Sequence, residues 1–377
     1  MNPISIIIPC LNEEQSLPIV LQKLNLIKTN QFKNREVEII VSDNGSTDRS
    51  VEIAREHGAR VVRASEKGYG AALQRGIDQA SFDTVVFADG DNTYDFLETP
   101  RLIEKMDEGY SLVLGSRLNG SIKKNAMPFL HRYLGTPVLS YLINSLYHQD
   151  GIKISDCNSG FRAFSRKEFL SWNVKSTGME FASEMLVKAL KAKAKIAEVP
   201  ISLDVHNTKR MPHLKTWRDG MRHLLQILLE APSFFSNVGL ILFTISWMVM
   251  LASLILKHPV FVGFASIFGI HTMVIALLGS FFALTIWGIG LFLSAKKNTD
   301  VRLYQSLIHM SEDKIFWLAS AFLFTSFLLL VLIFANWAMN HFKFLSLVRE
   351  TIALSAFISN GLLIISNIIT AHMIKRS

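Results

Sequence analysis

The sequence predicts an α/β domain built on a mostly parallel sheet, followed by an all-α membrane domain of about four helices. In the first part of the 377-residue chain, short apolar runs alternate with helix-patterned segments, as in a parallel sheet covered by helices on both faces. After about Pro232 come long apolar runs of about 20 residues, the length that crosses a bilayer core. We therefore expect a soluble domain at residues 1–231 and a membrane domain at residues 232–377.

The order of elements in the first domain predicts where a site would lie. Polar clusters at residues 12–13, 43–48 and 89–91 directly follow expected strands. Because ligands bind beyond the carboxyl ends of parallel strands, these clusters are expected to meet at one edge of the sheet. The expected strands are residues 4–8, 37–41, 59–63 and 84–88, and the expected helices between them are residues 15–27, 49–57 and 70–80.

Four membrane spans are expected, near residues 238–256, 269–293, 315–339 and 352–373. An interfacial or re-entrant piece is expected before the second span, although two tilted segments would also fit its length. The loop between the second and third spans is rich in Lys and Arg, and so is the chain end. By the positive-inside rule, the soluble domain and both termini face the cytoplasm, which predicts a multi-pass protein of the cytoplasmic membrane.

Residues 216–230 are expected to form an amphipathic helix that lies on the membrane surface. Its apolar residues recur at helical spacing, with Trp217, Met221, Leu224, Leu225 and Leu228 expected to face lipid. Basic residues gather around this segment against a lone Asp219, and they are Lys209, Arg210, Lys215, Arg218 and Arg222. Such a cluster suits anionic headgroups or a lipid phosphate, and nothing in the sequence predicts nucleic-acid binding.

Asp89 and Asp91 place two carboxylates one residue apart after a buried strand. Hard cations such as Mg²⁺ or Mn²⁺ bind carboxylates together with phosphate oxygens, and they neutralise a diphosphate leaving group. A solvated acidic turn is the common alternative for two aspartates at this spacing. The buried strand before them favours the metal site.

Two further clusters allow both a binding interpretation and an ordinary one. Asp43 could accept a hydrogen bond from a nucleobase or ribose, while Ser46 or Asp48 caps the next helix. Lys67 and the glycine-rich turn ending at Gly70 open a helix whose N-terminus would favour a phosphate, although an ordinary loop is equally compatible.

Several cationic and acidic side chains stand among apolar residues later in the domain. Arg117 follows an apolar run at the end of an expected strand, and His131–Arg132 and residues 156–162, which end in Arg162, are similarly placed. Glu180 and Glu184 share a helix face. They could have a functional role or could simply interact favourably with the helix dipole.

The chain resembles family 2 glycosyltransferases of the dolichol-phosphate mannose synthase and polyprenyl-phosphate glycosyltransferase type. The resemblance covers residues 1 to about 229, and its motifs are specific in order and spacing. The matching motifs are IPCLNE at residues 8–13, DNGSTD at 43–48, KGYGAA at 67–72, ADGD at 88–91, GSR at 115–117, SGFR at 159–162 and EVPI at 198–201.

This resemblance implies a glycosyltransferase A-type fold with a nucleotide-sugar and a divalent metal in its site. The sets it implies are Pro9, Asn12, Glu13, Asp43, Ser46, Lys67, Gly70 and Asp89 at the nucleotide-sugar; Asp89 and Asp91 at Mg²⁺ or Mn²⁺; and Arg117, His131, Arg132, Arg162, Lys209 and Arg210 at a lipid phosphate. Asp89, Asp91 and Arg117 would serve catalysis. The mannose synthases continue the acidic motif with Leu-Gln, whereas this chain has Asn92 and Thr93, so the third metal ligand and the sugar stay open.

The implied reaction is the inverting transfer of a hexose from a UDP- or GDP-sugar to undecaprenyl or dolichyl phosphate, as in the biosynthesis of cell walls or glycans. A phosphate monoester is largely dianionic at neutral pH, so its oxygen can attack without a strong general base. A processive polysaccharide synthase and a non-catalytic nucleotide-sugar-binding scaffold or translocase are the competing hypotheses. The synthase motif Gln-x-x-Arg-Trp is missing from the sequence, and whether the chain forms a homo-oligomer is left open.

Overall fold

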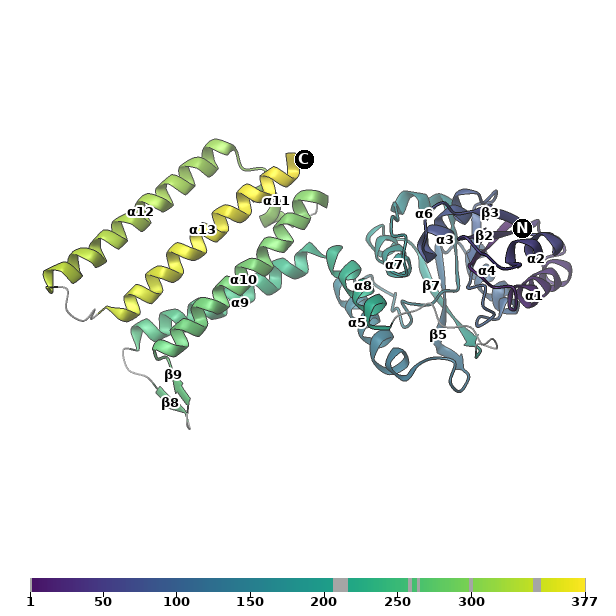
Figure 1. Cartoon of the computed structure of the whole chain (residues 1–377), viewed down its shortest axis with the longest axis horizontal. Coiled ribbons are helices and arrows are strands. Elements are labelled where there is room, and N and C mark those ends of the chain that lie inside the picture. Colours follow the sequence, from purple (N-terminus) through teal and green to yellow (C-terminus); the bar gives the residue numbers. More distant parts are fainter. Residues whose placement is uncertain are drawn as a thin grey trace. The chain divides into compact units, whose positions relative to one another are not determined.

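The computed structural model describes residues 2–205, 216–256, 260–262, 265–297, 301–341 and 347–376. The chain divides into two compact units, Met1–Glu230 and Ala231–Ser377. Figure 1 labels many of the helices and strands of the two units.

The first unit is built on a seven-stranded sheet in the order β3-β2-β1-β4-β6-β5-β7. β1 lies between β2 and β4 and is parallel to both, while β6 is antiparallel to β4 and β5. The mostly parallel sheet confirms the predicted fold class. The strands are β1 (Ile4–Cys10), β2 (Val37–Asp43), β3 (Arg60–Arg63), β4 (Thr84–Phe87), β5 (Leu112–Ile122), β6 (Arg162–Ser165) and β7 (Ile196–Leu203).

Helices cover both faces of this sheet because its central strands are apolar on both sides. Ile6 and Ile8 of β1 pack on one face, and Ile7 between them packs on the other, as the two-residue period of a strand requires. The first face carries α1 (Leu17–Asn30), α2 (Ser50–Glu56), the short helix η1 (Phe96–Glu98) and α4 (Thr99–Asp107). The second face carries α3 (Tyr69–Asp78), α5 (Thr136–Leu146), α6 (Arg166–Trp172), α7 (Phe181–Lys191) and α8 (Thr216–Leu229).

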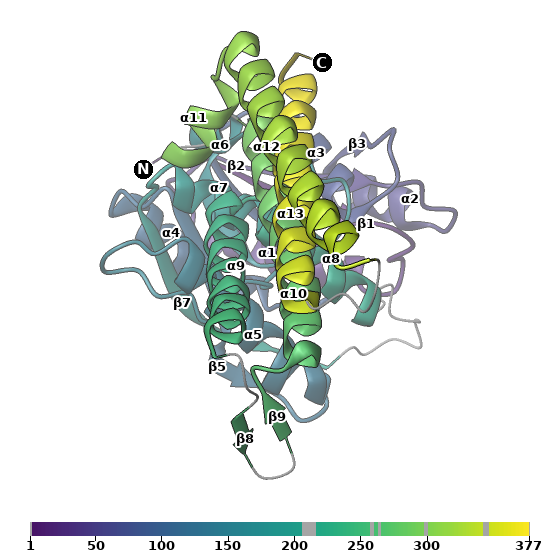
Figure 2. The same ribbon diagram turned by 90° about the vertical axis from the view of Figure 1, so that its left-hand side faces the viewer.

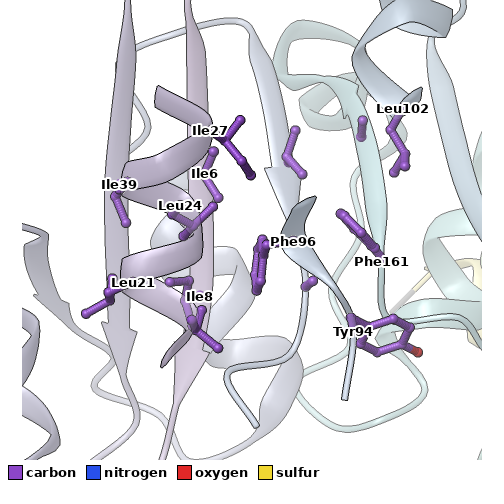
Figure 3. Packing of buried hydrophobic residues seen from close by; sticks show 14 of the residues in the cluster. Ile6, Ile8, Leu21, Leu24, Ile27, Ile39, Tyr94, Phe96, Leu102 and Phe161 are labelled. Carbon is purple, nitrogen blue, oxygen red and sulfur yellow. The ribbon is translucent and has the colours of Figure 1, made fainter. Parts of the chain in front are cut away.

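Figure 3 shows the first of these two cores at close range. Leu21, Leu24 and Ile27 of α1 point toward the isoleucines of β1 and β2. Phe96 and Phe161 extend the core beyond β4, with ring centroids 5.7 Å apart. This packing fixes the ends of β1 and β4, from which the polar loops start.

The second unit contains four helices that are long and apolar enough to cross a membrane, among the residues that the structure describes. They are α9 (Pro232–Ile255), α10 (Ile270–Lys297), α12 (Glu312–Met339) and α13 (Val348–Arg376), with the short α11 (Arg302–Ile308) between α10 and α12. α9 and α10 run side by side in both views (Figures 1 and 2). A polar contact joins α10 to α13, where Asn360 donates to the Ser280 hydroxyl over 2.9 Å.

The stretch before α10 forms an antiparallel hairpin of β8 (Val260–Val262) and β9 (Ala265–Ile267). The sequence favoured an interfacial or re-entrant piece at this place. A two-stranded hairpin leaves backbone groups unpaired at its edges, which is costly in hydrocarbon. The hairpin is therefore compatible with the interface or with water rather than with the bilayer core.

Candidate functional site

A pocket of about 540 Å³ opens at the carboxyl ends of β1, β2 and β4. It brings together Pro9, Glu13, Lys67, Asp89 and Asp91, which the sequence had placed in one site. Arginines of α8 also line it. The full lining is Pro9, Cys10, Leu11, Glu13, Asn44, Gly45, Lys67, Gly68, Tyr69, Ala72, Asp89, Gly90, Asp91, Gly178, Met179, Arg218, Asp219 and Arg222.

Asp89 is held in place from two sides. The Tyr69 hydroxyl donates to Asp89 Oδ1 over 2.8 Å, and Gly160 lies so close that a Cβ there would stand 2.9 Å from Asp89 Oδ2. Burial, followed by the charge of Asp89, raises the pKa of Tyr69 well above its ordinary value, so its hydroxyl stays protonated and donates. Sequence reasoning used Tyr69 only as part of a motif and missed this contact.

Asp91 lies in a tight turn of its own. Its Oδ1 accepts from the Thr93 backbone N–H over 3.0 Å and from the Thr93 hydroxyl over 2.6 Å. Asn92 between them adopts a left-handed conformation with φ 60°, which asparagine tolerates better than most residues. Thr93 thus orients Asp91 in this structure. This role of Thr93 differs from that of a third metal ligand.

The donor set at this edge fits a hard divalent cation that shares its coordination with a substrate. Asp89 and Asp91 both line the pocket, while no group of three or more His, Cys, Asp or Glu side chains suited to a metal occurs within the described residues. Mg²⁺ commonly binds through one or two carboxylates and completes its shell with substrate phosphates and water. The pair is compatible with that mode and not with an all-protein metal cage.

Hydrogen bonds join the loop after β1 to the loop after β2. The Asn12 backbone N–H donates to the Ser46 hydroxyl over 3.0 Å, and Asn12 Oδ1 accepts from the Thr47 N–H over 2.8 Å. The Glu13 N–H donates to the Ser50 hydroxyl over 2.7 Å. Asn12 and Ser46 therefore brace the pocket wall, whereas Glu13 contributes to the lining itself.

Asp43, expected at the nucleobase or ribose, is engaged in its own turn. Its two carboxylate oxygens accept from the backbone N–H groups of Gly45, at 3.2 Å, and of Ser46, at 2.9 Å. Asp48 accepts the N–H of Ser50 at the start of α2, so Ser46 is not the cap. The Asp43 side chain is short enough to reach the backbone N–H two residues later, as aspartates in turns commonly do. Asp43 is also nearly fully buried.

The glycines at the start of α3 serve close packing against another loop. A Cβ on Gly68 would lie 2.2 Å from the Thr177 carbonyl oxygen, and one on Gly70 would lie 2.3 Å from that of Ser176. The Ala71 N–H donates to the Thr177 carbonyl over 3.0 Å. One donor of this helix N-terminus is therefore already paired with a carbonyl. Lys67, Gly68 and Tyr69 of this turn line the pocket, whereas Gly70 does not.

Arg117, which is mostly buried, forms an ion pair with the fully buried Asp156, a partner that the sequence did not reveal. Its Nε and a terminal nitrogen each lie 2.7 Å from one oxygen of Asp156, and its backbone N–H donates over 3.0 Å. Burial alone would lower the pKa of Arg117, but the neighbouring Tyr94 and Asp156 raise it above its usual value. Arg117 is thus permanently charged and fixed in direction, although it does not line the pocket described above.

Arg162 requires a correction, because the sequence placed it at the acceptor phosphate. It is fully buried, and its guanidinium donates to the carbonyls of Ser159, Cys157 and Ala182 at 2.7 to 3.0 Å. Burial lowers its pKa. Arg162 holds three backbone segments together in this structure and does not reach the surface.

The remaining acceptor candidates fall into two groups. His131 and Arg132 begin a π-helical turn, His131–Gly135, that leads into α5, and both are half-buried. Partial burial, and then the positive charge of the Arg117 guanidinium, lower the pKa of His131. Lys209 and Arg210 lie outside the described residues.

α8 has three parallel stripes of side chains, of which the sequence predicted one. Trp217, Met221, Leu225 and Leu229 are exposed, while Leu224 and Leu228, which the sequence placed toward lipid, are half-buried. Arg218 and Arg222 form the second stripe and line the pocket. Asp219, His223 and Ile227 form the third, which is buried.

The comparisons with known proteins agree with this architecture. The profile described as "Glycosyl transferase family 2" matches residues 5–170. A low-salt glycan biosynthesis hexosyltransferase, Agl6 of Haloferax volcanii, is 37% identical over 273 residues, which cover 71% of this chain and 63% of the relative. The chain thus spans less than two thirds of that relative's length.

Two further similarities bear on the first unit. A dolichyl-phosphate hexose transferase of Haloferax volcanii is 30% identical over 202 residues, covering 53% of this chain and 82% of the relative. The crystal structure of glucosyl-3-phosphoglycerate synthase from Mycobacterium tuberculosis, in complex with Mn²⁺, UDP and phosphoglyceric acid, matches with a TM-score of 0.50 and 25% identity. That match covers 61% of this chain and 78% of the solved chain.

Proposed function

The chain belongs to glycosyltransferase family 2, and we propose that it transfers a hexose from a nucleotide-sugar to a polyprenyl phosphate at the cytoplasmic face of a membrane. One observation carries the proposal. Three aspartates, a glutamate, a lysine and two arginines line one pocket, in a domain whose last helix directly precedes four apolar helices. The acceptor is taken from the similarity to the dolichyl-phosphate hexose transferase.

The donor side of the pocket is assigned to the loops after β1, β2 and β4. Pro9 and Glu13 would contact the nucleoside, and Lys67 would contact the diphosphate as a point charge. Asn12, Asp43 and Ser46 would act indirectly, since they hold the loops that shape this wall. Gly70 would act only by keeping the turn after Lys67 close to the Thr177 loop.

Asp89 and Asp91 would hold a Mg²⁺ or Mn²⁺ ion. When bound, such an ion neutralises negative charge on the leaving nucleoside diphosphate. Tyr69 and Thr93 keep the two carboxylates in fixed directions through hydrogen bonds to Asp89 and Asp91. A preorganised pair of this kind needs little rearrangement as the donor arrives.

The acceptor phosphate supplies its own nucleophile. It is mostly dianionic near neutral pH because its second pKa is about 6, so the protein has to position it rather than remove a proton. Arg117, His131 and Arg132 are the acceptor residues that we retain from the sequence, with Lys209 and Arg210 as expectations outside the described residues. Attack opposite the leaving group would invert the anomeric centre.

The exposed stripe of α8 favours a site at the membrane surface. Trp217 is 79% exposed and Met221 is 54% exposed, which is unusual for large apolar side chains on a soluble domain. An amphipathic helix of this kind lies in the interface with its apolar side in the lipid. The pocket beside it would then receive the lipid's phosphate head without withdrawing the chain from the bilayer.

The test is transfer by membrane fractions that contain the full chain. UDP- and GDP-linked radiolabelled sugars are offered with undecaprenyl or dolichyl phosphate, and product is extracted into organic solvent. A short glycolipid supports the proposal, a long polymer would indicate a processive synthase, and no transfer from any donor would indicate a binding scaffold. Asp91→Asn keeps an acceptor for Thr93 but removes the charge, and it should lower transfer by at least about 100-fold.

A further inference from the structure

The three stripes of α8 place cationic side chains between a lipid-facing surface and a buried one. Residues four apart lie on the same side of a helix, and neighbouring residues are rotated by about 100°. Arg218 and Arg222 therefore follow the exposed Trp217 and Met221 around the helix and precede the buried Asp219 and His223. This order holds over two successive turns.

The buried stripe fixes α8 on the first unit. The Ser183 hydroxyl of α7 lies within hydrogen-bond distance of His223 Nδ1, and Ile227 packs fully buried in the second core. Tyr147 donates its hydroxyl to the Ile227 carbonyl. The rotation of α8 about its own axis is thereby set, and with it the direction of the arginine stripe.

The arginine stripe faces the pocket that holds Asp89 and Asp91. Arg218 and Arg222 both belong to the lining, together with the buried Asp219. Arg218 Nε lies 3.3 Å from Asp219 Oδ1, so one carboxylate orients the first arginine. The pocket thus has a carboxylate wall after β4 and a cationic wall on α8.

We propose that Arg222, with Arg218 beside it, binds the phosphate of the acceptor lipid, so that α8 is a wall of the active site as well as a membrane contact. An amphiphile with an anionic head and an apolar tail matches the order of the stripes. The head meets the two guanidinium groups, and the tail continues along Trp217 and Met221. Arginine suits this task because its planar fork pairs with phosphate oxygens in a bidentate manner.

This inference rests on the proposed acceptor class and narrows the basic cluster of the sequence to the two arginines that line the pocket. It also accounts for the position of Arg117, whose guanidinium is already paired in a bidentate manner with Asp156. Arg117 then acts as a positioning residue for the loop that carries Asp156. Direct phosphate contacts are then added on α8, while His131 and Arg132 keep the acceptor role that the sequence gave them.

The test measures equilibrium binding of farnesyl phosphate to the full chain in nonionic detergent, with farnesol as the ligand that lacks the phosphate. Wild type is compared with Arg222→Ala, Arg222→Lys and Arg218→Ala. Arg55→Ala removes one positive charge as a control, at a residue that is exposed on α2 and outside the pocket lining. Binding of UDP and GDP, and of vesicles containing phosphatidylglycerol, is measured on the same proteins.

The expected result is a loss of farnesyl phosphate affinity of about 10- to 100-fold in Arg222→Ala, the range for one charge-assisted contact. Arg222→Lys should recover part of this loss, and farnesol, UDP and GDP binding should stay within about twofold of wild type. Equal binding of farnesyl phosphate by wild type and Arg222→Ala would overturn the inference, as would no preference of wild type for farnesyl phosphate over farnesol. It would also be overturned if Arg222→Ala weakened only UDP and GDP binding, or only vesicle binding. Arginine-dependent phosphate binding without transfer from any sugar donor would instead uphold the inference and refute the proposed function.

Discussion

Acidification is expected to loosen α8 through a single histidine. Burial, then the charge of Arg162, lowers the pKa of His223 from 6.5 to about 4, with Asp219 opposing the shift and His131 adding to it. In the folded chain His223 is therefore neutral and pairs with the Ser183 hydroxyl at any pH above about 4. In the unfolded chain it takes up a proton below about pH 6.5.

The sign of the effect follows from proton uptake by the unfolded state. Above about pH 6.5 neither state is protonated at His223, so stability does not depend on it. As the pH falls toward about 4, the unfolded state gains the proton first, and the free energy of unfolding declines by about 3 kcal/mol in total. About 2 kcal/mol of this loss falls between about pH 7.5 and pH 5, which for a unit of this size lowers the Tm by about 4 to 8 °C.

The assay is thermal unfolding of the full chain in detergent, at a series of pH values, for wild type and His223→Gln. Glutamine can still hydrogen-bond to Ser183 but does not titrate, so the carboxylates that also destabilise the chain in acid cancel in the comparison. We expect His223→Gln to lose clearly less stability than wild type over this pH range. Equal losses in the two proteins would refute the claim that His223 is buried in its neutral form.

Three further predictions concern the pocket and the buried network beside it. Gly160→Ala should reduce transfer more than it reduces the Tm, because its Cβ would stand 2.9 Å from Asp89 Oδ2 and displace that carboxylate; unchanged transfer would contradict this. Asp156→Asn should cost about 3 to 5 kcal/mol in chemical unfolding, since it leaves the Arg117 charge buried with its pair broken, and a cost below about 1 kcal/mol would argue against a buried pair. Chelation by EDTA should abolish transfer, and Mg²⁺ or Mn²⁺ should restore it in wild type but not in Asp91→Asn; transfer that survives EDTA would exclude the metal.

The fold was predictable because two periodic signals were strong. Apolar runs alternate with helix-patterned segments as far as residue 88, and the sheet around β1, β2 and β4 forms as those runs predict. The antiparallel β6 was not predictable from its few residues, Arg162–Ser165. Its pairing to β4 and β5 is long-range, and no short-range pattern encodes it.

The position of the pocket, at the carboxyl ends of the parallel strands, was equally predictable. Pro9, Asp89 and Asp91 follow strands that lie side by side, so topology alone gathers them. Lys67 also lies in the lining. The side-chain partners could not be predicted, because Tyr69 meets Asp89 and Thr177 meets Gly68 only after the chain has folded.

Arginines show most clearly where sequence reasoning stops. Arg162 and Arg222 are the same residue type, and both stand among apolar neighbours. Arg162 is buried with its donors on three carbonyls, and Arg222 lines the pocket. A guanidinium can satisfy its five donors on backbone or on phosphate equally well, so only the burial of the side chain separates the two uses.

α8 shows a second limit of sequence reasoning. Periodicity reveals the stripes of a helix but not which stripe faces inward. In a soluble protein the apolar stripe of a helix is normally buried. In α8 the stripe of Trp217 and Met221 is exposed, and the stripe of Asp219 and His223 is buried. Inward-facing polar groups are costly unless they are paired or contribute to a site. The Ser183 contact accounts for His223, and Arg218 pairs with Asp219 at the pocket. The inverted polarity of α8 therefore argues that this helix belongs to the active site.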